Sequence, residues 1–377
     1  MNFLIVGHVI HKFSKGKYYA YGPYVREMNL WLDYVSEVTL LVPFSPTSLP
    51  DPIDLPYLHP YIRLVEIPEF SVTSPKAAWQ TFLNLPLLFG TTWKEMRKAD
   101  HIHLRCPGNM GLIGAMVQIL FPNKIKSAKY AGNWDKKSSQ PFTYRLQQSI
   151  LGNKFLSKNM QVLVYGDWPG ESSNIRSFFT ASYSQREISP LVEKYPNLQE
   201  EIRLIFAGGL NEGKQPLVST QVAHALTAKG YHVKLDLYGE GPERSKIEEY
   251  IHSNKLSDIV SLKGNVGAEQ LKLAYEKSHF LIFLSQSEGW PKVVAESMFW
   301  GCVPITTAVS CVPQMLGEGE RGNLVNPDIN EIQEVIEDFL LNPSTYLNKS
   351  QKASQWSRQF TLEKFKEEIK SVLFDRI

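Results

Sequence analysis

The chain has 377 residues, more than a single hydrophobic core usually supports, so two domains of ordinary size are expected. Its hydrophobic content of 43% and formal net charge of +2 exclude a disordered chain and give no support to nucleic-acid binding. The three cysteines, Cys106, Cys302 and Cys311, lack the spacing of a zinc site or a disulfide framework and fit a reducing, cytoplasmic setting.

The first seven residues are apolar but lack the basic leader and small-residue cleavage site of a secretory signal, so they predict a buried strand. No apolar run approaches the ~20 residues that a membrane-spanning helix needs. We therefore expect a cytoplasmic protein, with at most a peripheral contact at the inner face of the membrane.

Short apolar runs alternate with helical segments along the first half, which predicts a parallel sheet with crossover helices. The expected strands are 3–6, 38–42, 101–104, 161–165 and 178–183, and the expected helices are 24–34 and 110–120. Residues 189–197 contain several turn-forming residues and predict a linker.

The second half repeats this alternation and predicts a doubly wound domain. Its expected strands are 203–207, 233–238, 259–262, 280–284 and 303–306, and its expected helices are 216–229, 242–253, 270–276 and 292–300. Residues 354–373 predict one amphipathic helix with Phe365, Ile369 and Val372 on one face. We place the domains at 1–188, 189–350 and 351–377, the last being a C-terminal helix.

The segment 287–304 joins a predicted strand to a predicted helix. Pro291 suits the first helical position, and Gly301 suits the left-handed residue that follows the helix end. The unpaired amides of the first helical turn would then point beyond the carboxyl end of the strand, where α/β sheets bind ligands and helix N-termini favour phosphate. This arrangement predicts an anion site.

Glu288 precedes that helix and Glu296 lies about one and a half turns into it, so their carboxylates would flank the phosphate site. Carboxylates accept hydrogen bonds from hydroxyl groups, and one could hold a sugar while the other holds a ribose.

Together with Gly289, Gly301 and Pro304, these two glutamates resemble the Glu, seven residues, Glu motif of glycosyltransferase family 4. Other landmarks of the family are similar to three further segments of this chain: residues 237–243, residues 262–266, and the tail around Trp356, Phe360 and Phe365. The resemblance implies the GT-B fold, with two Rossmann-like domains facing across a cleft and a C-terminal helix that crosses back to the first domain. It also implies donor contacts from Glu288, Gly289, Trp290, Lys292, Val293, Glu296, Gly264 and Val266.

Residues 207–214 correspond to the family loop that usually supplies an arginine and then a lysine to the donor diphosphate. Lys214 stands at the place of the lysine, whereas Gly209 stands at the place of the arginine. The resemblance thus implies a clamp with half of its usual charge.

In the first domain, residues 100–107 resemble the family segment in which a histidine at a strand end faces the reaction centre. Arg105 falls at the place of that histidine, and His103 lies two residues earlier on the same strand face, so either residue is a catalytic candidate. Gly22 lies in a segment, 21–24, that is similar to the family loop near the acceptor.

The chain contains no Asp-x-Asp pair, so we expect no metal ion or other cofactor in the reaction. Lys214, the helix amides and Arg105 would neutralise the leaving group. The resemblance implies that the anomeric configuration is retained.

Taken with these observations, the resemblance implies a retaining hexosyltransferase that uses a UDP- or GDP-linked sugar and a saccharide or lipid-linked saccharide acceptor, in cell-surface polysaccharide synthesis. A nucleotide-sugar epimerase of GT-B fold and an inactive nucleotide-sugar-binding protein remain as alternatives. The sequence argues against a dehydrogenase, because no Gly-x-Gly-x-x-Gly turn follows the first strand of either half. The apolar segment 110–121 beside Lys124, Lys126 and Lys129 raises the hypothesis of a peripheral membrane contact, with a buried crossover helix as its alternative.

Overall fold

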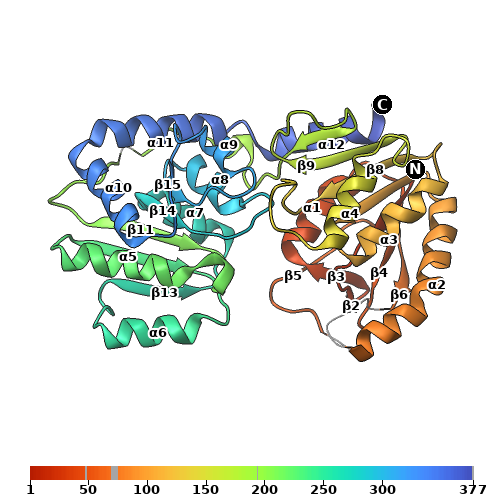
Figure 1. The fold of residues 1–377 in the computed structure, drawn as a ribbon, viewed down its shortest axis with the longest axis horizontal. Helices are drawn as coiled ribbons and strands as arrows, with labels where there is room; N and C mark the ends of the chain where they lie inside the picture. The colour runs from red at the N-terminus through yellow and green to blue at the C-terminus, as the bar shows by residue number, and fades with distance from the viewer. Residues whose placement is uncertain (47–48, 69–74, 193, 376–377) are drawn as a thin grey trace. The chain divides into compact units, whose positions relative to one another are not determined.

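The computed structural model describes residues 1–46, 49–68, 75–192 and 194–375, with the side chains of 75–82 excepted. The chain forms two compact units (Figure 1). The first unit contains Met1–Phe179 and Phe365–Ile377, and the second contains Thr180–Lys364.

The first unit is built on a seven-stranded parallel sheet with the strand order β10-β9-β8-β7-β1-β4-β6. Its strands are β1 (Asn2–Val6), β4 (Glu37–Pro43), β6 (Ile62–Ile67), β7 (His101–Cys106), β8 (Ile125–Tyr130), β9 (Met160–Tyr165) and β10 (Ile175–Phe178). Its helices are α1 (Gly22–Leu32), α2 (Pro75–Lys98), α3 (Asn109–Val117) and α4 (Phe142–Leu151). Helix α3 packs between α2 and α4. The central strands are nearly continuous apolar runs because helices cover both faces of a parallel sheet.

A small antiparallel sheet, absent from the sequence-based prediction, lies between β1 and β6 in the chain. It consists of β2 (Lys12–Ser14), β3 (Lys17–Tyr21) and β5 (Asp54–Pro56). The turn between β2 and β3 has left-handed backbone at Lys15 and Gly16, which allows the two strands to pair closely.

The second unit contains a six-stranded parallel sheet with the order β13-β12-β11-β14-β15-β16. Its strands are β11 (Ile202–Ala207), β12 (Val233–Tyr238), β13 (Val260–Gly264), β14 (Phe280–Phe283), β15 (Val303–Thr306) and β16 (Asn323–Leu324). Its helices are α5 (Pro216–Ala228), α6 (Arg244–Ser253), α7 (Ala268–Lys277), α8 (Lys292–Phe299), α9 (Val312–Leu316), α10 (Ile329–Leu341) and α11 (Pro343–Ser357). The predicted doubly wound domain is confirmed.

Two predictions for the secondary structure are wrong. The expected single helix at 354–373 is two helices, because α11 ends at Ser357 and α12 (Leu362–Phe374) begins after a turn. The expected strand at 178–183 is β10, which ends at Phe178, followed by irregular backbone. In both cases the apolar pattern continues through a break in the backbone, so periodicity alone does not reveal the break.

The predicted return of the C-terminal helix to the first unit is confirmed. The Phe365 ring contacts the rings of Phe178 and Phe179 at centroid distances of 5.4 and 5.7 Å. Glu368 forms an ion pair with Arg176. The buried residues of α12 from Phe365 to Leu373 therefore complete the core of the first unit.

The structure gives another role to the lysines behind the hypothesis of a membrane contact at 110–121. The side chains of Lys126 and Lys129 are buried, and their ammonium groups donate hydrogen bonds to backbone carbonyls, including that of Phe179. Lys124 donates to two further carbonyls. Because these basic groups serve the fold, we favour the alternative of a crossover helix, which is α3 at Asn109–Val117. Among the described residues, no helix has both the length and the apolar character needed to cross a membrane.

Candidate functional site

The strand order in each unit identifies where a ligand is expected. In the second unit the chain moves from β11 outward to β12 and β13, then returns to the other side of β11 as β14. In the first unit the chain moves from β1 to β4 and β6, then returns to the other side of β1 as β7. In open α/β sheets ligands bind at such a reversal, beyond the carboxyl ends of the two strands. The loops after β11 and β14, and those after β1 and β7, are therefore the candidate sites.

In the second unit, Lys214 and Glu288 meet at this reversal. Lys214 ends a short helical turn after β11, where the Asn211 side chain accepts a hydrogen bond from its backbone amide at 3.2 Å. Its ammonium group forms an ion pair with the Glu288 carboxylate, and the hydroxyl of Ser285 lies 3.5 Å away. The Phe283 ring lies 5.1 Å from the ammonium. The site thus places a cation and a carboxylate, each partly accessible, at the end of the sheet.

The N-terminus of α8 lies directly after Glu288 in the chain. Pro291 is the N-cap residue, one position earlier than predicted, and the first intrahelical hydrogen bond runs from the Val294 amide to the Pro291 carbonyl at 3.0 Å. The amides of Lys292 and Val293 precede that bond, so they are the ones that a helix N-terminus offers to an anion. Gly301, with φ of 71°, follows the helix in the predicted left-handed conformation.

Glu296, one turn further along α8, contacts the segment that enters the second unit. Its carboxylate accepts a hydrogen bond from the Ser182 hydroxyl at 2.5 Å and a longer one from the Tyr275 hydroxyl at 3.5 Å. Burial, and then the nearby negative charge of Glu296, raise the pKa values of Tyr183 and Tyr275, so both phenols stay protonated and able to donate.

Trp290 anchors the loop between Glu288 and α8. Its ring stacks on Trp356 at 6.1 Å and meets Phe360 edge-on at 5.6 Å, and the Arg321 guanidinium lies over Trp356. Its ring thus packs against the C-terminal part of the second unit. We infer that Trp290 positions the loop through this packing.

The remaining predicted donor residues lie on adjoining loops. Gly209 follows β11, and a Cβ atom there would lie 2.9 Å from the Asn211 side-chain nitrogen, so an arginine at this position requires Asn211 to move. Gly264 ends β13 with φ of 68°, and its carbonyl accepts a hydrogen bond from the Gly239 amide at 2.9 Å. Val266 is half-buried in the loop before α7. The carbonyl of Gly289 accepts a hydrogen bond from the Ser310 hydroxyl at 3.2 Å. Lys292 and Val293 are half-buried in the first turn of α8.

In the first unit, Arg105 is part of a nearly buried charge cluster. Its guanidinium donates to the Glu27 carboxylate at 2.6 Å and lies 5.2 Å from the centre of the Tyr24 ring. Burial is the largest influence on the pKa of Arg105 and lowers it, but the attraction and hydrogen bond of Glu27, together with Tyr24 and Tyr165, raise that pKa above its ordinary value. Arg105 is therefore a fixed positive charge near the carboxyl end of β7.

His103 and Gly22 occupy structural environments. His103 is fully buried beside Trp31, its ring shares a hydrogen bond with the Ser127 hydroxyl at 2.8 Å, and burial holds its pKa well below the ordinary value. A Cβ atom at Gly22 would lie 2.3 Å from the Ile53 carbonyl oxygen, so glycine is needed for close packing. Their predicted roles toward a substrate stay predictions, and packing accounts for both residue types.

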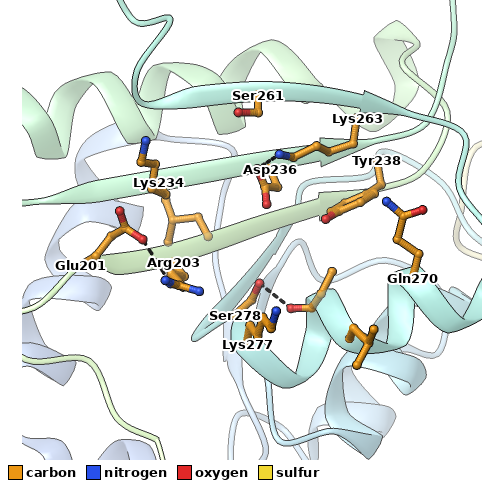
Figure 2. A pocket seen from close by; sticks show the side chains of 13 residues that line it. Glu201, Arg203, Lys234, Asp236, Tyr238, Ser261, Lys263, Gln270, Lys277 and Ser278 are labelled. Atoms are coloured by element: carbon orange, nitrogen blue, oxygen red, sulfur yellow. Dashed lines mark hydrogen bonds and ion pairs between the residues drawn. The ribbon is translucent and has the colours of Figure 1, made fainter.

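A separate polar groove of about 460 Å³ lies between α7 and the sheet of the second unit. Figure 2 shows its paired charges, Lys263 with Asp236 and Arg203 with Glu201, each 3.1 Å apart. The groove opens on the face of the sheet, and none of the predicted donor residues lines it. We favour the strand-end site because Lys214 pairs there with Glu288, which lies shortly before the N-terminus of α8 in the chain. Among the residues that the structure describes, no group of three or more metal-ligating side chains is placed to hold an ion.

Sequence reasoning missed three contacts of these sites: Ser285 beside Lys214, Ser182 at Glu296, and Glu27 at Arg105. The first two depend on tertiary packing and leave no local signal. Glu27 leaves one, because it lies on the same face of α1 as the buried Tyr24, Met28 and Trp31. An acid on the apolar face of a helix indicates a buried partner of opposite charge.

Comparison with known proteins gives a family match for the second unit. Residues 189–358 match the family described as Glycosyl transferases group 1. An uncharacterized glycosyltransferase of Haemophilus influenzae is 32% identical over 159 residues, which cover 41% of this chain and 43% of that protein. The chain thus spans less than half the length of this relative.

Solved structures match along the whole chain. Sucrose-phosphate synthase from Thermosynechococcus elongatus gives a TM-score of 0.67 at 17% identity, covering 99% of this chain and 98% of that chain. HepE from Anabaena, solved in complex with UDP and glucose, gives a TM-score of 0.67 at 12% identity and covers 99% of both chains. At these identities the likeness concerns the fold. The chain therefore has the GT-B fold, and its residues 189–358 match the glycosyl transferases group 1 family.

Proposed function

We propose that this protein is a retaining glycosyltransferase that moves a sugar from a UDP- or GDP-linked donor, bound at the second unit, to a saccharide or lipid-linked saccharide acceptor. One observation carries the proposal: Lys214 and Glu288 lie together at the strand reversal of the second unit, directly before the N-terminus of α8. A cation and free amides suit a diphosphate, and a carboxylate suits sugar hydroxyls. The UDP and glucose bound to HepE, a protein of the same fold, support this choice of ligand.

The proposed chemistry assigns a separate task to each group. Lys214 and the amides of Lys292 and Val293 stabilise the negative charge that develops on the departing diphosphate. Glu288 accepts hydrogen bonds from the transferred sugar, and Glu296 accepts them from the ribose. When the diphosphate is in place, the Lys214 ammonium exchanges part of its contact with Glu288 for phosphate oxygens.

We expect transfer on the front face of the sugar. The bond between the anomeric carbon and the phosphate oxygen breaks, and its electron pair stays on the phosphate. The acceptor oxygen forms a bond to the same face of the anomeric carbon, and its proton passes to the departing phosphate oxygen. This sequence requires no protein nucleophile and keeps the anomeric configuration.

The first experiment identifies the donor. UDP- and GDP-linked sugars are screened by thermal unfolding, where a ligand at about 100 times its dissociation constant adds about 2.7 kcal/mol of stability. The products formed from each stabilising compound then separate the alternatives. Nucleoside diphosphate plus a transferred or hydrolysed sugar of unchanged configuration supports the transferase.

The other products support the alternatives. An epimerised sugar in place of transfer supports the epimerase, and stabilisation without any product supports a binding protein. Gly209 at the place of the usual arginine is the feature that favours the binding protein. We further propose that the reaction takes place in the cytoplasm and contributes to cell-surface polysaccharide.

A further inference from the structure

The strand reversal of the first unit, between β1 and β7, also presents groups for binding. These two strands are parallel neighbours with Val6 opposite Leu104. A Cβ atom at Gly7, the residue after β1, would lie 3.6 Å from Cβ of Arg105. His8 therefore lies past the carboxyl end of β1 and near the carboxyl end of β7, close to Arg105, in the region where an open α/β sheet binds its ligand.

The His8 ring lies close to the backbone at the start of α3. A Cβ atom at Gly108, the N-cap residue of α3, would lie 2.7 Å from Nδ1 of His8. Gly108 also has φ of 152°, a conformation that residues with side chains rarely adopt. Only glycine at this position lets the imidazole lie against the backbone.

The environment of His8 differs from that of the other histidines near these strands. His11, His101 and His103 are fully buried, and each shares a hydrogen bond within the first unit. His8 is exposed at the end of the sheet. Partial desolvation and the positive charge of Arg105 lower the pKa of His8, so the imidazole is neutral near pH 7, with one nitrogen that accepts and one that donates.

Charge balance indicates what chemistry suits this position. The charge of Arg105 is already matched by Glu27 at 2.6 Å, so it has little attraction left for an anion. A pocket of about 550 Å³ begins at Val9 and Ile10, the residues after His8. It is lined by one basic side chain, Lys12, and by three acidic ones, Asp51, Asp54 and Glu66. Phosphate and carboxylate groups are disfavoured there, whereas uncharged hydroxyl groups are not.

We propose that His8 is a substrate-binding residue of the first unit, whose imidazole accepts a hydrogen bond from a hydroxyl of an uncharged saccharide acceptor. This inference rests on the proposed transferase function and specifies the acceptor as neutral at the group that His8 meets. Gly108 is the positioning residue that holds the ring. The resemblance to the family implies roles for His103 and Arg105, which lie in β7. It implies none for His8, which follows β1.

The test compares His8→Ala, His8→Gln and Gly108→Ala with the control His252→Ala, an exposed histidine on α6. Donors are UDP-glucose, UDP-N-acetylglucosamine and GDP-mannose, and acceptors are neutral p-nitrophenyl hexosides, with p-nitrophenyl glucuronide as the anionic probe. Loss of the hydrogen bond should lower kcat/KM for the neutral acceptor about tenfold in His8→Ala. Gly108→Ala should behave like His8→Ala, and His8→Gln, which keeps an accepting oxygen, should retain more transfer.

Affinity for UDP or GDP should stay unchanged in all these variants, because nucleotide binding reports on the second unit. Three results would each overturn the assignment of His8. They are wild-type transfer rates in His8→Ala, a preference of the wild type for the glucuronide, and nucleotide binding by the wild type without transfer to any neutral hexoside. Failure of the wild type to bind any nucleoside diphosphate would instead contradict the proposed function itself.

Discussion

Replacing Lys214 by alanine should lower both the stability of the protein and its affinity for nucleotide. A second substitution, Glu288→Gln, can separate these two effects. The lysine side chain is 24% exposed and that of its partner, Glu288, is 11% exposed. Lys214→Ala therefore leaves a largely buried carboxylate without its cation and also removes the cation that we assign to the diphosphate. We expect lower stability and weaker nucleotide binding together.

The size of each effect follows from this partial burial. Two unit charges at 4 Å attract by about 4 kcal/mol at an effective dielectric constant of about 20. Because Lys214 is about one-quarter exposed, solvent screening reduces the loss of stability to about 1–2 kcal/mol. A charge-assisted contact to phosphate is worth about 1.5–3 kcal/mol, which corresponds to roughly a 10- to 100-fold rise in the dissociation constant for UDP or GDP.

The assay combines urea unfolding with calorimetric titration of UDP and GDP. In Lys214→Ala/Glu288→Gln the unpaired carboxylate is gone, so stability should largely return while nucleotide affinity stays low. Lys246→Ala is the matched control, since Lys246 pairs with Glu243 at 3.1 Å on the surface of the same unit. Its stability and its affinity should change by about 0.5 kcal/mol at most.

Unchanged nucleotide affinity in Lys214→Ala would remove this lysine from the phosphate site. Recovery of affinity in the double variant would show that the single substitution acts through the charge of Glu288 and not through loss of a phosphate contact. Either result refutes the reasoning.

Further predictions concern the first unit. Arg105→Leu should lower the free energy of unfolding by about 3 kcal/mol in urea, because the Glu27 carboxylate, 7% exposed, loses its partner. The double variant Arg105→Leu/Glu27→Leu should recover most of this loss. An unchanged urea midpoint in Arg105→Leu would contradict a stabilising role of the pair. The free energy of unfolding should also fall as the pH drops from about 6.5 toward 4. In the folded chain the pKa of His11 is lowered to about 4 and that of His101 to about 3, so only the unfolded chain takes up protons on these histidines in this range. Urea midpoints at about pH 7 and about pH 5 measure this dependence, and equal midpoints would argue against neutral buried histidines.

From β11 to β15, the alternation of strands and helices in the second unit could be predicted almost element by element, whereas α9, β16 and α10 were not predicted. The predicted ranges 233–238 and 303–306 coincide with β12 and β15. These strands are short, apolar and separated by helices with clear end signals, so local pattern and tertiary structure agree. The small sheet of β2, β3 and β5 escaped prediction because its strands are three to five residues long and half-exposed.

The candidate site was predictable where its residues adjoin one another in sequence. Glu288, Pro291 and Gly301 lie in one strand-to-helix segment, whose local signals indicate a helix N-terminus. The ion pair between Lys214 and Glu288 joins residues 74 positions apart, and the contact of Ser182 with Glu296 joins residues 114 positions apart. No local pattern encodes such pairs. The placement of His8 likewise depends on the pairing of β1 with β7.

The most direct test of the account compares how Glu288→Gln and Glu296→Gln bind a donor nucleotide-sugar and its free nucleoside diphosphate, by calorimetric titration beside the wild type. Glu296→Gln should weaken both ligands to a similar extent, because both contain the ribose. Glu288→Gln should keep near-normal affinity for the diphosphate and lose turnover, since the sugar is no longer held as charge develops at its anomeric carbon. If both variants bind both ligands as the wild type does, the two glutamates do not contact the donor, and the proposed site is wrong.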